Sequence, residues 1–193
     1  MIANEYSKAR QTEWVGWYFE FVGLPALVNA YGGGPRQIGA TEFDYVRSFV
    51  WDLKAHAQKG LAAPHDVVGQ APLNDRDAIL RCARESHSIG FLVLSGAFVP
   101  DAFDAWHRKV RGSTRQRGPG SRALKAAFRP VTVDAYVFQG ATGVEDALEQ
   151  RVLIAFRQGR QPSGAARRPK LKLDLRRGRE NGYVMASRAV GAA

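Results

Sequence analysis

The chain has 193 residues, 45% of them hydrophobic, which suits a single domain with a real core. No run of about eighteen apolar residues occurs and residues 1–10 are polar, so the sequence predicts neither a membrane span nor a signal peptide. One cysteine, Cys82, excludes an internal disulfide, so we expect a reducing, cytoplasmic compartment and a buried helical position for this residue.

The net charge of +10 is unevenly distributed along the chain. Residues 1–100 contain nine Lys and Arg and ten Asp and Glu, whereas residues 101–193 contain nineteen and eight. The basic excess therefore lies entirely in the second half. A one-sided excess favours a polyanionic partner over a basic surface that serves solubility alone, and arginines clustered in loops indicate nucleic acid.

Residues 4–31 have a helical pattern, which we expect Gly23 and Pro25 to interrupt. Residues 14–28 contain one charged side chain, Glu20. A lone carboxylate on an apolar helix is costly unless something pairs with it. It belongs either to a buried ion pair with an arginine or to a functional site, and the residues that follow favour the site.

Residues 41–56 alternate between apolar and polar side chains and predict a hairpin of two short strands, after a glycine-rich turn at 32–35 and a short strand at 36–40. One face of the hairpin is apolar and is expected in the core: Phe43, Tyr45, Phe49, Trp51 and Leu53. The other face is polar: Asp44, Asp52, Lys54 and His56. Glu42 is expected opposite Lys54, as a salt-bridge partner or a spare ligand.

Asp44 lies opposite Asp52 only if the hairpin loop contains an odd number of residues, such as residues 47–49, because side chains alternate with a period of two. Directly opposite side chains have Cβ atoms ~5 Å apart. Two carboxylates at this distance need a proton, a cation or a metal ion at neutral pH. Lys54 supplies one positive charge on the same face, and oxygen ligands of this kind suit a hard divalent cation.

After a loop at 57–72, we expect Asn74 to cap a helix at 75–86 that buries Cys82. Residues 88–95 form a continuous apolar run, which is typical of a strand covered on both faces. A strand, a helix and a buried strand in this order predict a right-handed parallel crossover.

The second half of the chain has weaker patterns. Its expected elements are a helix at 101–110, a basic loop at 111–129, a strand at 131–139, a short helix at 144–150, a strand at 151–157 that extends the sheet, a linker at 158–169 and a terminal hairpin at 170–177 and 183–190.

This order of parts resembles the PD-(D/E)XK nuclease superfamily, which has an αβββαβ core and includes most type II restriction endonucleases. The likeness covers roughly residues 10–100 and rests on the Gly-Trp-Tyr-Phe-Glu run at 16–20, on Phe43-Asp44 and on Asp52-Leu53-Lys54. Phe43 stands where the family name has proline, and the gap between the two aspartates is short. The resemblance implies an α/β fold with a mixed central sheet flanked by helices.

In this interpretation residues 1–110 form the catalytic core. Residues 111–193 form a basic, β-rich extension of the same domain that recognises nucleic acid. Ten of its basic residues are expected to contact phosphates or bases: Arg115, Arg117, Arg122, Lys125, Arg157, Arg160, Arg167, Arg168, Lys170 and Lys172.

The resemblance also implies a role for each motif residue. Asp44, Asp52 and the backbone carbonyl of Leu53 would ligate Mg²⁺, for which Mn²⁺ can substitute. Lys54 would position or deprotonate the attacking water and stabilise the developing charge. Glu20 would hold a second metal ion, a metal-bound water or Lys54. We expect the implied products to carry a 5′-phosphate and a 3′-hydroxyl, and we expect His56 to be an exposed strand residue, although contact with the phosphate is the alternative.

The function expected from these residues is that of a Mg²⁺-dependent DNA endonuclease, and most specifically a type II restriction endonuclease that cuts double-stranded DNA as a homodimer. Three alternatives remain at this point. The first is a non-restriction nuclease of the same fold that acts in repair, at junctions or on RNA. The second is a nucleic-acid-binding protein without catalysis. The third is an α/β protein whose hairpin face is only a salt-bridged surface.

Overall fold

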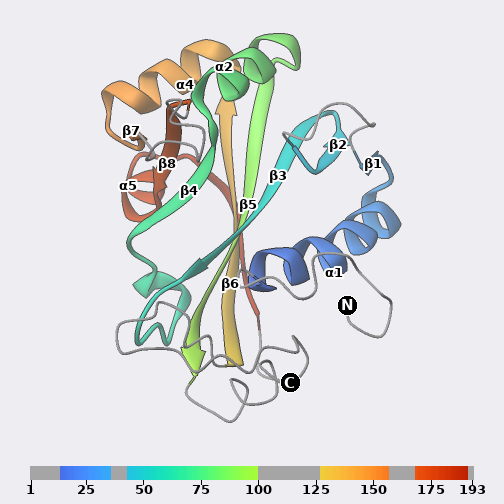
Figure 1. Cartoon of the computed structure of the whole chain (residues 1–193), viewed down its shortest axis with the longest axis vertical. Helices are drawn as coiled ribbons and strands as arrows, with labels where there is room; N and C mark the ends of the chain where they lie inside the picture. Colours follow the sequence, from blue (N-terminus) through green and yellow to red (C-terminus); the bar gives the residue numbers. More distant parts are fainter. Residues whose placement is uncertain (1–13, 36–42, 100–126, 157–167, 191–193) are drawn as a thin grey trace, which may run out of the picture.

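The computed structural model describes residues 14–35, 43–99, 127–156 and 168–190. Within these residues the chain has an α/β architecture with a mixed sheet of six strands, a smaller sheet of three strands and four helices (Figure 1). No helix of the described part is both long and apolar enough to span a membrane. The expected elements at 36–40, 101–110 and 158–167, and most of the basic loop at 111–129, lie outside the described residues.

The first helix, α1 (Trp14–Tyr31), runs through Gly23 and Pro25, so the expected break is wrong. Pro25 is exposed, so its ring lies on the solvent side of the helix. Gly23 serves packing instead of helix termination, because a Cβ at this position would lie 3.1 Å from Leu53 Cδ2. The glycine therefore lets α1 approach the sheet closely.

The six-stranded sheet has the order β1-β2-β3-β5-β6-β9, in which β3 and β5 are parallel and the other neighbours are antiparallel. The parallel pair confirms the expected crossover. The strands are β1 (Gly34–Pro35), β2 (Tyr45–Arg47), β3 (Phe49–Ala57), β5 (Ser88–Val99), β6 (Ala127–Gln139) and β9 (Val184–Ala189).

The hairpin of β2 and β3 has the predicted odd loop. Arg47 pairs with Phe49, and Ser48 alone forms the tip, with a φ of 59°. The paired register ends at Tyr45 and Trp51, and the backbone N–H of Asp44 donates to the carbonyl of Trp51 at 3.1 Å, so Asp44 lies one residue beyond the ladder, at the position where the continued register would meet Asp52. The predicted apolar face is only partly correct. Leu53 is buried on the side covered by α1, whereas Phe43 joins the main hydrophobic cluster, because the chain bends at Asp44 before β2 begins.

The main core lies between the six-stranded sheet and a layer that contains the smaller sheet and three helices. The smaller sheet has the order β4-β8-β7. The elements of this layer are β4 (Gln70–Asp75), β7 (Leu153–Phe156), β8 (Lys170–Asp174), α2 (Arg76–Glu85), α4 (Gly140–Glu149) and α5 (Leu175–Glu180). Ile89, Phe91, Phe138 and Leu173 are fully buried in the cluster they form, so both halves of the chain build one core.

For two predicted elements of the second half of the chain, the expected strand partners are wrong. Residues 153–156 form a strand, but it belongs to the smaller sheet and does not extend the large one. The expected terminal hairpin does not form, because β8 pairs with β4 and β7 while β9 pairs with β6. Helix α5 separates them and packs through Gly178, where a Cβ would lie 2.7 Å from the ring of Tyr136.

Helix α2 buries Cys82, as predicted, but its N-cap is Asp75 and not Asn74. The Asp75 carboxylate accepts hydrogen bonds from the backbone N–H groups of Asp77 and Ala78, each at 3.1 Å. Asn74, one residue earlier, is therefore available for contact with β3. Helix α4 begins four residues earlier than expected.

Candidate functional site

Asp44 and Asp52 lie close together at the open end of the β2–β3 hairpin, away from its tip at Ser48. The Oδ2 atom of Asp44 accepts a hydrogen bond from the backbone N–H of Leu53 at 2.8 Å. This bond holds the Asp44 carboxylate against β3, close enough for its negative charge to raise the pKa of Asp52. The predicted juxtaposition of the two carboxylates is therefore present.

Asp52 is 2% exposed and lies between two donors. Its Oδ2 forms an ion pair with the ammonium of Lys54, and its Oδ1 accepts a hydrogen bond from Asn74 Nδ2 at 3.4 Å. Burial raises the pKa of Asp52 to about 7, the Lys54 charge opposes this rise, and the Asp44 charge adds to it. One ammonium group therefore does not fully balance the two carboxylates, and the site favours a further positive charge.

The backbone carbonyl of Leu53 points toward the same place. In a strand, the N–H and C=O of one residue point to the same side. Because the Leu53 N–H points to Asp44, the Leu53 carbonyl lies on that side as well. In the described residues the β2–β3 register ends at the pair Tyr45 and Trp51, so this edge of β3 lies beyond the hairpin ladder.

These oxygen atoms are suitable ligands for a magnesium ion. Mg²⁺ in proteins is held by one or two carboxylates together with water and substrate phosphate, and here two carboxylates and one carbonyl meet. Among the residues that the structure describes, no group of three or more His, Cys, Asp and Glu side chains is arranged around a metal position. Asp44, Asp52 and the Leu53 carbonyl would thus form an incomplete shell that solvent and substrate complete.

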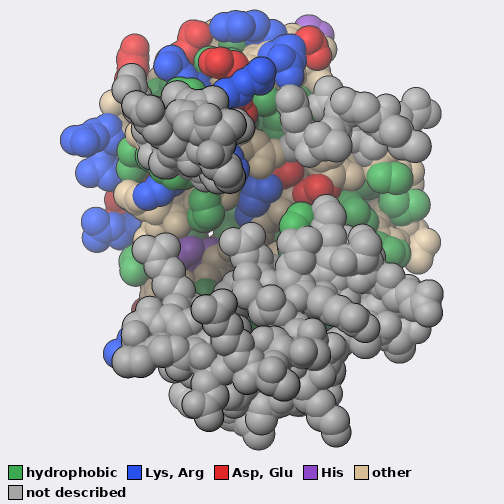
Figure 2. All heavy atoms as spheres, viewed as in Figure 1, with side chains coloured by type: hydrophobic (Ala, Val, Ile, Leu, Met, Phe, Trp, Pro, Cys, Tyr) green, Lys and Arg blue, Asp and Glu red, His purple; other side chains and the backbone are tan. Residues whose placement is uncertain are grey.

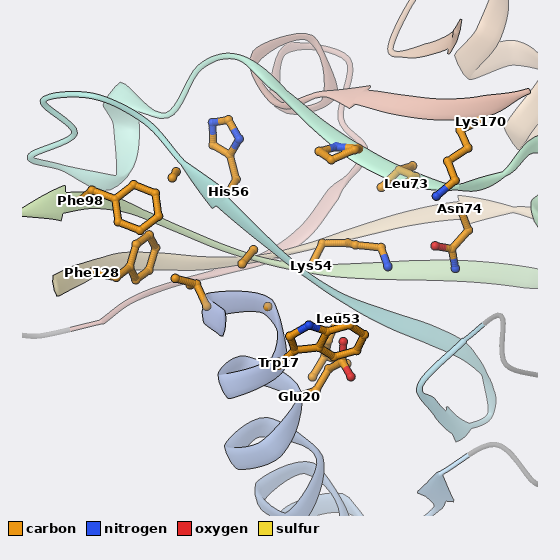
Figure 3. A pocket seen from close by; sticks show the side chains of 15 residues that line it. Trp17, Glu20, Leu53, Lys54, His56, Leu73, Asn74, Phe98, Phe128 and Lys170 are labelled. Carbon is orange, nitrogen blue, oxygen red and sulfur yellow. The ribbon is translucent and has the colours of Figure 1, made fainter. Parts of the chain in front are cut away.

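A pocket with a volume of about 450 Å³ lies beside the hairpin residues Leu53 and Lys54 (Figure 3). Asp44 and Asp52 do not line it, but Lys54 and Asn74, the two partners of Asp52, do. It is lined by five consecutive residues of β3, Leu53 to Ala57, so it follows the edge of that strand. Helix α1 forms one wall, and β4 and Lys170 of β8 form the other. Figure 3 shows Phe98 and Phe128 at the end of the pocket that lies away from Lys54 and Asn74.

Glu20 lines this pocket on the α1 side, next to Trp17 and Leu53 (Figure 3). It is half-buried, and the pocket contains both Glu20 and Lys54. The structure thus brings the predicted Glu20 to the same cavity as Leu53 and Lys54, whereas Asp44 and Asp52 do not line that cavity. Its role toward a metal ion, a water molecule or Lys54 stays a prediction.

His56 is half-buried, so the expectation of an exposed strand histidine is wrong. Its Nε2 lies 2.9 Å from the carbonyl of Val68, and burial lowers its pKa. The loop before β4 covers this end of β3, and Gly69 lies against the ring, since a Cβ there would be 3.1 Å from Cε1. A neutral imidazole can donate a hydrogen bond to the carbonyl of Val68, so His56 connects β3 to this loop.

The basic residues predicted to contact nucleic acid fall into two groups. Arg168 is exposed, Lys170 lines the pocket, and Lys172 lies over the Phe156 ring with its Nζ 4.6 Å from the centroid. The remainder lie outside the described residues, as does Glu42: Arg115, Arg117, Arg122, Lys125, Arg157, Arg160 and Arg167.

Sequence reasoning missed two features of the site. It assigned Asn74 to a helix cap, although the aspartate that follows it offered an equally good cap and left Asn74 free for another role. It also missed the buried Asp134, which accepts hydrogen bonds from Arg179 Nη2 and Ser187 Oγ, each at 2.6 Å. Because Asp134 is fully paired, it holds α5 and β9 to β6 and is not a candidate catalytic group.

No protein-family model matches the chain, and comparisons with curated proteins and with solved structures give no significant match.

Proposed function

We propose that the protein is a Mg²⁺-dependent endonuclease that hydrolyses phosphodiester bonds of double-stranded DNA and leaves a 5′-phosphate and a 3′-hydroxyl. Within this class, a type II restriction endonuclease of the PD-(D/E)XK kind is the specific proposal. The observation that carries it is the meeting of Asp44 and Asp52 beside Lys54, whose side chain lines a pocket. This pairing of two carboxylates with an amine suits metal-assisted hydrolysis of a phosphate ester.

The element order supports the same proposal. The chain runs α1-β1-β2-β3-β4-α2-β5, which is an αβββαβ order with one additional strand, β4. That strand leaves the large sheet and pairs with β8, so the additional strand does not disturb the parallel pair β3 and β5. The same strand carries Asn74 to the site.

In the proposed mechanism each residue has a task that follows from its contacts. A magnesium ion held by Asp44, Asp52 and the Leu53 carbonyl would polarise the phosphate and lower the pKa of the attacking water. The Leu53 N–H fixes Asp44, and Asn74 and Lys54 fix Asp52. The Lys54 ammonium has three protons, so it can hold Asp52 and still donate to a water molecule or a phosphate oxygen in the pocket.

The basic surface supports a polyanionic substrate. Figure 2 shows Lys and Arg side chains gathered over α5, on the side of the molecule that carries the smaller sheet. Arg176 and Arg177 are exposed there, and Lys170 and Lys172 lie on the adjoining strand β8. A cationic surface attracts the backbone of DNA.

We further propose that the enzyme acts as a homodimer, because cutting both strands of a symmetric site calls for two copies. Helix α1 supports the presence of a second copy. It carries one charge in 18 residues, and Tyr18 and Val22 on its outer side are 45% and 40% exposed. On a chain with a net charge of +10, this uncharged stripe is where two copies can approach with the least repulsion.

The decisive experiment incubates plasmid DNA with the protein in Mg²⁺ and then in EDTA. Discrete fragments in Mg²⁺ support a restriction enzyme, a smear supports a nonspecific nuclease, and intact plasmid contradicts the proposal. Asp52→Ala should abolish cleavage and retain DNA binding in Ca²⁺. Asp66→Ala is the control, because Asp66 is an exposed aspartate whose side chain lies beside His65 and not at the hairpin.

One observation favours the alternative of a nucleic-acid-binding protein without catalysis. The Lys54–Asp52 ion pair gives the buried Asp52 carboxylate a positively charged partner in the absence of a metal ion. In that case duplex DNA would bind equally well with and without a divalent cation, and the plasmid would stay intact. Under the proposed function, divalent cation should tighten DNA binding.

A further inference from the structure

A second lysine reaches the pocket from outside the hairpin. Lys170 is the first residue of β8, is half-buried, and lines the cavity together with Lys54 and Asn74. Figure 3 shows the polar ends of these three side chains at the same end of the pocket. The smaller sheet therefore contributes a cation to the site that the hairpin motif alone does not contain.

Lys170 makes no ion pair with any carboxylate of the described residues. Asp75 is its ladder partner on β4; the Asp75 Oδ1 atom accepts from the backbone N–H groups that it caps on α2, and its buried Oδ2 atom has no hydrogen-bond partner in the described residues. Lys54, by contrast, is held by Asp52. Lys170 is thus the lysine of this pocket that forms no ion pair within the described part of the chain, although the Asp75 carboxylate is carried by the neighbouring strand.

The pocket also continues past the position where a single phosphate would lie. Lys54 pairs in register with Val93, and Phe98 lies five residues further along β5, which corresponds to ~16 Å at 3.3 Å per residue. Ala55 and Ala57 line the cavity between these points without filling it. A ligand with one phosphate occupies only part of this length, whereas a strand of nucleic acid can follow it.

We propose that Lys170 binds the phosphate adjacent to the one that is cleaved, so that the substrate must be a chain with at least two consecutive phosphodiesters. This inference rests on the proposed nuclease function and adds a second phosphate position, held by the smaller sheet. Lys54 serves the reacting phosphate, and Lys170 fixes the register of the strand in the pocket. Lys170 is a binding residue and takes no part in the chemical step.

Lys59 provides a control for this proposal. It is an exposed lysine in the turn that follows β3, and it does not line the pocket. Replacing Lys59 or Lys170 with glutamine removes one positive charge from the chain, so a difference between the two variants reflects the position of the charge and not the net charge.

The first test measures binding of a synthetic DNA duplex in Ca²⁺ as a function of salt. Each phosphate contact contributes ~0.9 to the slope of log K against log salt concentration. Lys170→Gln should lower the magnitude of this slope by about 0.9, and Lys59→Gln should leave it unchanged. Lys170→Arg keeps the charge and should keep the slope. Equal slopes for Lys170→Gln and the wild type would overturn the inference.

The second test compares two substrates in Mg²⁺. Lys170→Gln should lower kcat/KM on DNA about tenfold, the effect of one lost charge-assisted contact, and should leave hydrolysis of bis(p-nitrophenyl) phosphate unchanged. Equal losses on both substrates would show that Lys170 acts on the reacting phosphate or on the fold, against the inference. If the wild-type protein neither binds nor cuts DNA, the proposed function itself fails. If it cuts DNA while the salt slope is unchanged in Lys170→Gln, only the inference about Lys170 fails.

Discussion

The carboxylate of Asp44 accepts its hydrogen bond from the backbone N–H of Leu53, across the hairpin and directly beside Asp52. This bond holds the Asp44 carboxylate close to the Asp52 carboxylate, although two negative charges repel each other. A backbone donor on a strand of the sheet cannot move aside as a side chain can. The hairpin therefore enforces a charge arrangement that a divalent cation stabilises.

This relationship predicts different outcomes for two substitutions of Asp44. Asp44→Asn keeps an oxygen that can accept from the Leu53 N–H, so stability should change little while binding of Mg²⁺ or Tb³⁺ and cleavage are lost. Asp44→Ala removes the acceptor as well and should also cost about 1 kcal/mol of stability. Calorimetric metal titration and urea unfolding separate the two effects. Unchanged metal binding in Asp44→Asn would show that Asp44 is not a ligand.

Asp52 should make the stability of the metal-free protein depend on pH in a defined direction. Its pKa rises from the ordinary 3.8 to about 7 in the folded state. Between these values the folded protein retains a proton that the unfolded chain releases, so Asp52 lowers stability progressively as pH rises from about 4 to 7. Above pH 7 the loss is complete and constant.

Asp52→Asn removes this titration. In EDTA, its melting temperature relative to the wild type should therefore increase between pH 5 and pH 8, at ~2–4 °C per kcal/mol for a chain of this size. At pH 8, magnesium should raise the melting temperature of the wild type and leave that of Asp52→Asn unchanged, because only the wild type binds the metal ion. A difference in melting temperature that is independent of pH would contradict the raised pKa.

Asn74 and Asp75 are adjacent in sequence and should have separable effects. Asn74 donates to Asp52, whereas Asp75 caps α2. Asn74→Ala should weaken metal binding about tenfold, as loss of a group that orients a ligand does, with little change in melting temperature. Asp75→Ala should cost about 1 kcal/mol of stability and leave metal affinity unchanged. Terbium luminescence and thermal unfolding of both variants test this, and equal metal affinity in Asn74→Ala and the wild type would exclude the positioning role.

The sequence predicted the hairpin well because its signals are local. Alternation with a period of two and an odd loop fixed which residues face one another, and Ser48 at the tip agrees with both. The choice between Asn74 and Asp75 as the cap could not be made locally, since both residue types cap helices well. The Asp52 carboxylate lies beside Asn74 in the folded protein, so the Asn74 amide donates to Asp52 and does not cap the helix.

Long-range pairing explains the other differences. Strands β8 and β9 are neighbours in sequence and looked like a hairpin, but their partners β4 and β6 lie far away in the chain. The Gly23 and Pro25 pair looked like a helix end, whereas its glycine fits against Leu53 of a strand that lies 30 residues later. His56 looked exposed because the loop that covers it is recognisable only in the folded protein. None of these contacts leaves a periodic signal in the sequence.

The outer side of α1 should control the oligomeric state. Val22→Glu places a charge in the uncharged stripe and should convert a dimer into a monomer, because two copies would then bury like charges against each other. Val68→Glu is the matched control, since Val68 is similarly exposed, at 43% against 40%, but lies in the loop before β4. Light scattering after gel filtration gives the mass of each protein. Plasmid cleavage gives a second readout: the wild type and Val68→Glu should linearise the plasmid, whereas Val22→Glu should only nick it. A wild type that is monomeric and still linearises the plasmid would show that one copy cuts both strands and that the apolar stripe has another role.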